Sequence, residues 1–346
     1  MTDTTTDLPG LDLRRLTDYL AGATPGLVTG PLSAELIAGG RSNLTYRLTD
    51  GATRWVLRRP PLGHVLRTAH DMGREYRVLS ALADTAVPVP RTVHLCADPD
   101  VLGAPFYLMQ HVDGVVLRTR RQCEELGEAN TTAVVHRLVD VLAELHTVDP
   151  ASVGLADFGR PEGYLTRQVV RWGKQLDASR SRDVAGIDEL RDRLAASVPT
   201  STRHGLLHGD YRLDNALVDP AVPDIAAVLD WEMSTLGDPL ADVGLLVVYA
   251  SGRRGDDVIT GDAITAPGFP PTDELVARYA DRTGVDVSTL DWYVALNCFK
   301  LAVVLEGIHY RFTQGKTVGA GFDQIGQRVP GLVAEGLAAL DGEGST

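Results

Sequence analysis

Polar side chains that could do chemistry are concentrated in the segment LHGDYRLDN (207–215). Asp210 and Asn215 have the spacing D-x-x-x-x-N, and Asp230 follows Asn215 by fifteen residues, directly after the apolar run IAAVL. Phosphoryl transfer from a nucleotide needs a carboxylate that accepts the proton of the acceptor hydroxyl, and an amide oxygen and a second carboxylate that hold Mg²⁺. Asp, Asn and Gly are also common turn residues, so this segment alone fits an ordinary turn equally well.

Features upstream favour phosphoryl transfer over a turn. The segment GGRSN (39–43) lies between expected strands, and its free backbone N–H groups could cover a phosphate. Gly39, Gly40, Ser42 and Asn43 are therefore candidate nucleotide-binding residues.

A basic residue and its partner follow this turn. In the expected strand WVLRR (55–59), Arg58 shares a face with Val56, since successive side chains of a strand alternate between its two faces. Glu75, in the next expected helix, is the natural partner for Arg58. A cation, a helical glutamate, D-x-x-x-x-N and a later aspartate occur in the same order as the matching residues of protein kinases.

The elements that must position these residues fall into a β-rich and a helical part. A helix is expected over 11–20, strands over 33–59 with a turn at Asp50-Gly51, a helix over 69–84, and strands over 92–96 and 105–112. Pro60 should end the third strand because proline cannot donate a ladder hydrogen bond.

Beyond residue 113 the pattern becomes helical. A helix should begin with Asn130 or Thr131 as its N-cap, and further helices are expected near 239–250, 272–283, 288–312 and 329–340. We therefore predict an α+β, two-lobed fold with a small β-rich N-lobe (33–112) and a larger helical C-lobe (113–346), preceded by a helical extension (1–32). The cleft between two lobes is the default place for a ligand.

Composition restricts the class of function. The 346 residues have a formal net charge of −13, which argues against non-specific binding to nucleic acid or to an anionic membrane. The start MTDTTTDLPG does not resemble a signal peptide, and we expect a cytoplasmic protein. Cys96, Cys123 and Cys298 are scattered and are expected to be reduced and buried. The oligomeric state cannot be predicted from these features.

Over residues 33–312 the chain resembles the aminoglycoside phosphotransferase-like kinases, which share a protein-kinase-like fold. The specific stretches are VLRRPP, REYRVLSAL, VPVPR, LGAPFYLMQHVDG, LHGDYRLDN and VLDWEMSTLGDPLADVG. It is most similar to the branch that includes kinase-like domains fused to acyl-CoA dehydrogenases. The resemblance implies an ATP- or GTP-dependent, Mg²⁺-dependent transfer to a hydroxyl of a small molecule.

By this resemblance each candidate residue has an expected role. Asp210 would be the catalytic base, Asn215 and Asp230 the Mg²⁺ ligands, Arg58 a contact to the nucleotide phosphates, and Glu75 the residue that holds Arg58. The inter-lobe hinge beside the nucleotide base would consist of Met109, Gln110, His111 and Val112. The family commonly has lysine where Arg58 stands. Arginine can bind phosphate bidentately, although Arg59 is a rival for the role.

Other residues have expected supporting roles. His208 should brace the catalytic loop, and Asp242 should be a buried carboxylate bonded to that loop. The face formed by Arg167, Arg171 and Lys174 is either a solvated basic stripe or a surface for an anionic acceptor. Glu306 and Tyr310 are further candidates for contact with the acceptor.

Alternative functions remain open at this point. His204, His208, Asp210 and Asp230 could form a metallohydrolase centre, but that reading leaves Arg58 and Glu75 without a role. The chain could also be a non-catalytic nucleotide-binding pseudokinase, although all three expected catalytic residues are present. Among acceptors, hydroxy acids or hydroxyacyl compounds are favoured over antibiotics.

Overall fold

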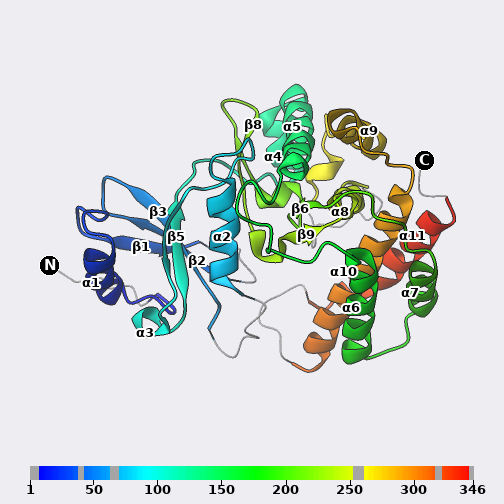
Figure 1. The fold of residues 1–346 in the computed structure, drawn as a ribbon, viewed down its shortest axis with the longest axis horizontal. Coiled ribbons are helices and arrows are strands. Elements are labelled where there is room, and N and C mark those ends of the chain that lie inside the picture. The colour runs from blue at the N-terminus through cyan, green and yellow to red at the C-terminus, as the bar shows by residue number, and fades with distance from the viewer. Residues whose placement is uncertain (1–7, 38–42, 63–69, 252–260, 316–321, 343–346) are drawn as a thin grey trace. The chain divides into compact units, whose positions relative to one another are not determined.

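The computed structural model describes residues 8–37, 43–62, 70–251, 261–315 and 322–342. It confirms the predicted α+β fold, with a β-sheet followed along the chain by a helical region (Figure 1). The chain forms two compact units. The first contains Met1–Asp113 and Ala226–Glu232, and the second contains Gly114–Ile225 and Met233–Thr346.

The first unit is built on a five-stranded antiparallel sheet with the order β1-β2-β3-β5-β4. Its strands are β1 (Ser33–Leu36), β2 (Leu44–Thr49), β3 (Arg54–Arg59), β4 (Thr92–Cys96) and β5 (Phe106–Gln110). The predicted turn between β2 and β3 is present: Asp50 Oδ1 accepts the N–H groups of Ala52 and Thr53 at 3.0 and 2.8 Å. β3 ends immediately before Pro60, as predicted.

The two faces of this sheet are covered by different helices, which Figure 1 shows on either side of it. One face packs against α1 (Leu13–Ala23) and α3 (Pro99–Leu102) in an apolar core. That core includes Leu16, Leu20, Tyr46, Leu48, Trp55, Leu57, Phe106 and Leu108. The other face carries Val56 and Arg58 and lies toward α2 (Met72–Leu82). Because α1 belongs to the core of the first unit, residues 13–23 are part of that unit rather than a separate extension.

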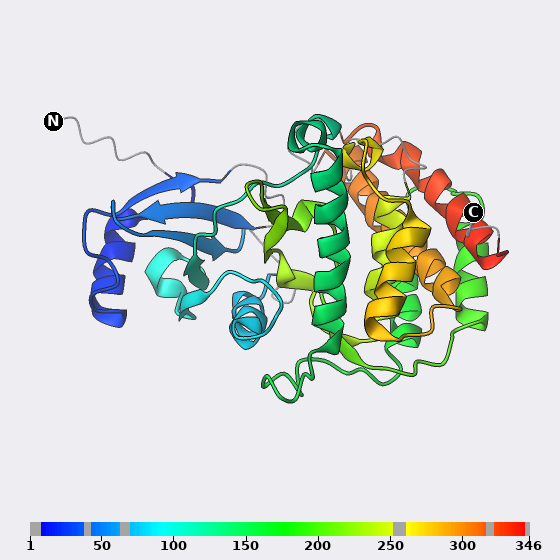
Figure 2. The ribbon, with the colours of Figure 1, turned by 90° about the horizontal axis from the view of Figure 1, so that it is seen from above.

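The second unit is mostly helical. Its helices are α4 (Arg120–Leu126), α5 (Glu128–Thr147), α6 (Tyr164–Ser179), α7 (Ile187–Ala196), α8 (Leu240–Ala250), α9 (Thr272–Thr283), α10 (Leu290–Thr313) and α11 (Val329–Leu340). α10 packs against α6, α8 and α11, and Figure 2 shows α5 running beside α9. Two short strands, β6 (Gly205–Leu207) and β9 (Thr235–Gly237), pair antiparallel. A second pair is β7 (Ala216–Asp219) and β8 (Asp224–Val228), and the division between the units falls within β8.

The predicted start of α5 is wrong. The helix begins at Glu128 with Gly127 as its N-cap, and Thr131 lies inside it with its hydroxyl donating to the carbonyl of Cys123 at 3.1 Å. Gly127 has φ +93°, a conformation that glycine adopts without strain, and it both ends α4 and precedes α5. The short helices α3 and α4 were not predicted, since each is too short to show a clear apolar period. α7 was also missed, although Ile187, Leu190 and Leu194 have helical spacing.

All three cysteines are buried and none is in a disulfide. No helix among the described residues combines the length and apolar character needed to cross a membrane.

Replacing Leu57 with alanine should destabilise the sheet core. Leu57 is fully buried, so Leu57→Ala should lower the free energy of unfolding by about 2–5 kcal/mol through lost burial and a cavity. Urea denaturation followed by tryptophan fluorescence measures this change. The control is Leu62→Ala, whose side chain is 58% exposed and which should change the midpoint little. Equal midpoints for the two variants would contradict the assigned core.

Candidate functional site

Arg58 is the centre of a buried ionic group in the first unit. Its Nη1 lies 3.1 Å from Glu75 Oε1, and its Nη2 donates to Asp230 Oδ1 at 2.9 Å. Arg58 is 9% exposed and Glu75 is 1% exposed. The predicted pairing of Arg58 with Glu75 is confirmed, and Asp230 is a third member of the group.

The charges in this group stabilise one another. Burial disfavours the charged guanidinium, but the negative charges around it, chiefly Glu75, outweigh that effect and raise the pKa of Arg58. Burial raises the pKa of Glu75, while the charge of Arg58 opposes this shift. Because arginine remains protonated in proteins, the group combines one fixed positive charge with two carboxyl groups. Carboxyl oxygens are ligands that Mg²⁺ prefers, so this composition suits a site that also takes a cation.

Asp230 has an unusual backbone conformation. Its φ is +66°, and no other non-glycine residue in the described part of the chain has a positive φ. A non-glycine residue in this region is strained by about 1–3 kcal/mol, and such strain is concentrated at functional sites. The conformation lies directly after β8, where the chain turns into the short helix Trp231–Met233.

Arg59 is not the cation of this group. Its side chain leaves the opposite face of β3, where Nη1 donates to the carbonyls of Leu102, at 2.8 Å, and Gly10. These contacts connect β3 with Gly10, which precedes α1, and with Leu102, the last residue of α3. Of the two candidate arginines, only Arg58 meets Glu75.

Asn43 is the described member of the predicted glycine turn. Its Nδ2 donates to Glu232 Oε2 at 3.0 Å, and its Oδ1 lies 2.9 Å from Nδ1 of His70. Gly39, Gly40 and Ser42 lie outside the described residues. His70 and Glu232 were not predicted, although Glu232 belongs to the DWE sequence that drew attention to Asp230.

The predicted hinge residues lie at the end of β5. Gln110 pairs with Trp55 of β3, and the N–H of His111 donates to the carbonyl of Arg54 at 3.3 Å. Burial lowers the pKa of His111. The contact of Gln110, His111 and Val112 with a nucleotide base stays a prediction.

In the second unit, a buried carboxylate holds the segment after β6. Asp242, at the start of α8, accepts the N–H groups of His208 at 2.7 Å and Gly209 at 2.9 Å. His146 Nε2 lies 3.4 Å from the same carboxylate. Burial alone would raise the pKa of Asp242, but the hydrogen bonds and charge of His146, together with the loop N–H groups, give a net lowering. The structural role predicted for Asp242 matches these contacts.

The same loop is shaped by His208 and Gly209. His208 is fully buried, and its Nδ1 accepts the N–H of Asp210 at 3.2 Å, which is the contact expected of a brace. Gly209 has φ +84°, and a Cβ there would lie 2.6 Å from the carbonyl oxygen of Met233. Only glycine fits this position.

Asp210 and Asn215 are in direct contact. Asn215 Nδ2 donates to the Asp210 carbonyl at 2.8 Å and to Asp210 Oδ2 at 3.0 Å. Because the amide nitrogen faces Asp210, the amide oxygen of Asn215 points to the other side, where it could bind a metal ion. The D-x-x-x-x-N spacing thus brings the two side chains together, as a catalytic loop requires.

Two further residues reach this loop from distant helices. Tyr249 in α8 donates its hydroxyl to Asp210 Oδ1 at 2.9 Å, and Lys300 in α10 donates Nζ to the Gly209 carbonyl at 2.7 Å. Burial lowers the pKa of Lys300, while Asp210 and Asp242 oppose that shift. Neither residue was predicted, since nothing in the local sequence marks them.

The candidate acceptor residues on α6 share an exposed face. The guanidinium of Arg167 donates to the carbonyls of Arg160 and Glu162, and that of Arg171 lies 5.2 Å from the Trp172 ring centroid. Lys174 is exposed on the same helix. Contact of this face with an acceptor stays a prediction.

Glu306 and Tyr310 differ in their surroundings. Glu306 is 1% exposed, and its carboxylate accepts Arg182 Nη2 at 2.9 Å and Ser181 Oγ at 3.2 Å. These contacts give Glu306 a structural role in α10. Tyr310 is exposed, and contact of either residue with substrate stays a prediction.

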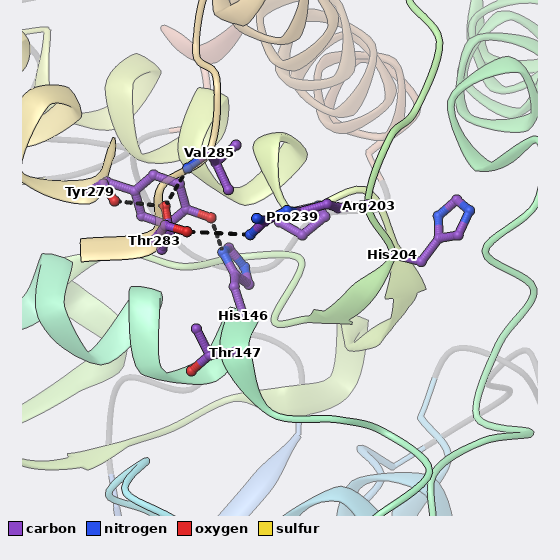
Figure 3. A pocket seen from close by; sticks show the side chains of 8 residues that line it. All are labelled: His146, Thr147, Arg203, His204, Pro239, Tyr279, Thr283 and Val285. Atoms are coloured by element: carbon purple, nitrogen blue, oxygen red, sulfur yellow. Dashed lines mark hydrogen bonds between the residues drawn. The ribbon is translucent and has the colours of Figure 1, made fainter. Parts of the chain in front are cut away.

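A shallow hollow of about 110 Å³ lies behind the bracing carboxylate (Figure 3). His146 lines it and connects the hydroxyl of Tyr279, 2.8 Å from Nδ1, with Asp242. His204 also lines it but lies apart from His146 in Figure 3. Within the described residues, no three His, Cys, Asp or Glu side chains come together as a metal centre, so the structure lends no support to the metallohydrolase alternative.

Comparison with known proteins shows which family and which solved structures this chain is similar to. The model of the phosphotransferase enzyme family matches residues 33–286. Acyl-CoA dehydrogenase family member 11 of Gallus gallus is 34% identical over 94% of this chain, but the match covers 43% of that protein, so the chain spans less than half of this relative.

Two solved structures extend the comparison. A Ralstonia eutropha protein assigned to the aminoglycoside phosphotransferases superposes with a TM-score of 0.83 at 34% identity, covering 96% of this chain and 98% of the other. The aminoglycoside phosphotransferase APH(4)-Ia, in complex with AMP-PNP and hygromycin B, has a TM-score of 0.60 at 16% identity, covering 96% and 99% of the two chains. This second likeness shows the fold alone.

Removing the positive charge at Arg58 should destabilise the first unit. Arg58→Met leaves the buried carboxylate of Glu75 without its cation, which should lower the free energy of unfolding by about 3–5 kcal/mol. The double variant Arg58→Met/Glu75→Leu removes both charges and should regain much of that loss. Urea denaturation compares the three proteins. A single variant as stable as the wild type would show that the ion pair has no stabilising role.

Replacing the bracing carboxylate should also cost stability. In Asp242→Asn one loop N–H loses its acceptor, and the free energy of unfolding should fall by about 2–3 kcal/mol. The lowered pKa of Asp242 means that its stabilisation is fully present above about pH 4 and is lost as the pH falls through the folded-state pKa. The difference in the free energy of unfolding between the wild type and Asp242→Asn should therefore become smaller as the pH falls. Asp192→Asn, whose side chain is 73% exposed, is the control, and a gap that widened in acid would contradict the assignment.

Proposed function

Because the chain belongs to the phosphotransferase enzyme family, we propose that it transfers the γ-phosphoryl group of ATP or GTP to a hydroxyl group of a small molecule. The observation that carries this proposal is the geometry of Asp210. Its carboxylate is held at the end of a braced buried loop and contacts Asn215 of the D-x-x-x-x-N sequence. This is the arrangement that a general base in phosphoryl transfer needs.

In the proposed step, Asp210 accepts the proton of the acceptor hydroxyl. The acceptor oxygen forms a bond to the γ-phosphorus, and the bond from that phosphorus to the β–γ bridging oxygen breaks. The nucleoside diphosphate leaves, and the proton stays on Asp210 until it passes to solvent. Asp210 thus orients the hydroxyl and removes the proton that would otherwise stay on the bridging oxygen of the phosphate ester.

The described donors fit Mg²⁺ in chemical type. Asn215 offers an amide oxygen and Asp230 a carboxylate, and oxygen ligands of this kind are those that Mg²⁺ prefers. When bound by these residues, Mg²⁺ would offset negative charge on the nucleotide phosphates.

We assign the nucleotide to the residues of the first unit. Arg58, fixed by Glu75, would contact the phosphates, and its permanently charged guanidinium can do so bidentately. Gly39, Gly40, Ser42 and Asn43 would cover the phosphates, and Gln110, His111 and Val112 would adjoin the base. The AMP-PNP complex of the distantly similar APH(4)-Ia supports a nucleoside triphosphate as the donor.

The acceptor is proposed to be a hydroxy acid or hydroxyacyl compound rather than an antibiotic. The relative in Gallus gallus is named as an acyl-CoA dehydrogenase, which supports an acyl-type acceptor. The basic face of α6 also suits a carboxylate or phosphate. We propose no nucleic acid or membrane partner, because the chain has a net charge of −13, and we place the reaction in the cytoplasm.

Asp210→Ala should abolish turnover while sparing nucleotide binding. Removing the base should lower kcat at least about 100-fold, whereas MgATP affinity should be almost unchanged because Asp210 is assigned to the acceptor hydroxyl. Turnover is measured by a phosphotransfer screen over sugars, aminoglycosides, macrolides, choline-like alcohols and hydroxy acids. Calorimetry measures the affinity for MgATP. Near-full turnover of the variant would remove Asp210 from the mechanism. Nucleotide binding without transfer by the wild type to any acceptor would favour the pseudokinase alternative.

The triple variant Arg167→Gln/Arg171→Gln/Lys174→Gln should raise the KM for an anionic acceptor about tenfold or more, since it removes three positive charges from one face. The KM for nucleotide should not change. Arg120→Gln/Arg121→Gln on α4 is the control for a general loss of surface charge. Unchanged acceptor kinetics in the triple variant would show that the face is only a solvated stripe.

A further inference from the structure

Both oxygens of the Asp210 carboxylate accept hydrogen bonds, and the donors come from different elements. Oδ2 accepts from Asn215 Nδ2 at 3.0 Å, within the loop itself, and Oδ1 accepts from the hydroxyl of Tyr249 at 2.9 Å. Tyr249 lies in the last turn of α8 and is 8% exposed. The role of Asn215 follows from the loop sequence, whereas Tyr249 has no role in the function as proposed so far.

We propose that Tyr249 is a positioning residue for the base, which fixes the plane of the Asp210 carboxylate. This inference rests on the proposed function, because it assumes that Asp210 accepts the proton of the acceptor hydroxyl. Tyr249 acts through Asp210 and does not itself touch the reacting atoms.

The geometry explains how the carboxylate can be held without being blocked. Rotation about the Cβ–Cγ bond of Asp210 would break the bonds to Asn215 and Tyr249 together, so the two donors define its plane. Each carboxylate oxygen can accept two hydrogen bonds, so an acceptor hydroxyl can still bind to either oxygen. A base fixed in this way needs little reorganisation when the hydroxyl arrives.

Tyr249 is itself fixed by a neighbour from the catalytic loop. The guanidinium of Arg212 lies 4.6 Å from the centroid of the Tyr249 ring and is paired with Asp214. Burial and the charge of Asp210 raise the pKa of the Tyr249 phenol far above its ordinary value. Tyr249 therefore remains a hydrogen-bond donor at every pH at which an aspartate can act as a base.

Several other ionisable groups surround Asp210, and they stay in place when Tyr249 is changed. His208 accepts the N–H of Asp210, and Lys300 lies at the preceding carbonyl. These groups are His208, Arg212 and Asp214 from the loop and Lys300 from α10. None of them is altered in Tyr249→Phe, so the effect of removing one hydroxyl can be measured against a constant background.

The test is Tyr249→Phe, which removes only the hydroxyl. We expect kcat to fall about 10- to 100-fold, with the KM values for acceptor and nucleotide nearly unchanged. Because Tyr249 is assigned to the orientation of Asp210 and not to binding, the loss should fall on kcat rather than on either KM. A kcat equal to that of the wild type would overturn the proposal.

Tyr293→Phe is the matched control. The hydroxyl of Tyr293 is also buried, and it donates to Asp238 at 2.9 Å instead of Asp210. This variant should lose stability much as Tyr249→Phe does, but its kcat should match that of the wild type. If the kcat of Tyr249→Phe were as high as that of Tyr293→Phe, Tyr249 would be only a packing residue and the proposal would fail.

A spectroscopic measurement separates this inference from the proposed function. In full-length protein with ¹³Cζ-labelled tyrosine, the signal missing from Tyr249→Phe identifies Tyr249. Asp210→Asn should shift that signal and leave the Tyr293 signal in place, with no acceptor or turnover required. A shift without phosphotransfer by the wild type would support the contact and count against the proposed function. Phosphotransfer by the wild type, with no shift and a wild-type kcat in Tyr249→Phe, would overturn the role of Tyr249 alone.

Discussion

The carboxylate of Asp242 is the contact on which the geometry of the second unit depends. The segment after β6 leaves the strand pairing, so the N–H groups of His208 and Gly209 need other acceptors, and one buried side chain accepts both. Once these two peptides are fixed, the next residue, Asp210, has little freedom. The backbone of Asp210, the residue proposed as the base, is thus positioned by these hydrogen bonds, and the contacts of its side chain then fix the carboxylate.

Carboxyl groups also organise the first unit, but there they bind a guanidinium instead of backbone N–H groups. The carboxyl groups of Glu75 and Asp230 both contact a single guanidinium, whose fork of donors serves the two together. An ammonium on a lysine side chain would present one centre instead of two. Arginine at position 58 therefore matches a site in which helix α2 and the segment after β8 are held by one residue.

Local patterns in the sequence predicted the arrangement of residues that lie close together along the chain. The alternation of β3 placed Val56 and Arg58 on one face, and the D-x-x-x-x-N spacing brought Asp210 to Asn215. The start of α5 was missed because Asn130 and Thr131 are good N-caps in isolation, whereas Gly127 decides the start through its backbone conformation. Tyr249 and Lys300 could not be predicted. Each reaches the loop from a helix packed against it from far along the chain, and the sequence around each is that of an ordinary buried helix.

The left-handed backbone at Asp230 has a consequence for how this position can change. Glycine would adopt φ +66° without strain, so at this position the most stable residue and the chemically useful residue are different. A carboxylate here is kept at the expense of folding stability, and the bond from Arg58 offsets part of that expense. Under the proposed function, a lineage that no longer used this carboxylate would be free to relax the backbone at position 230.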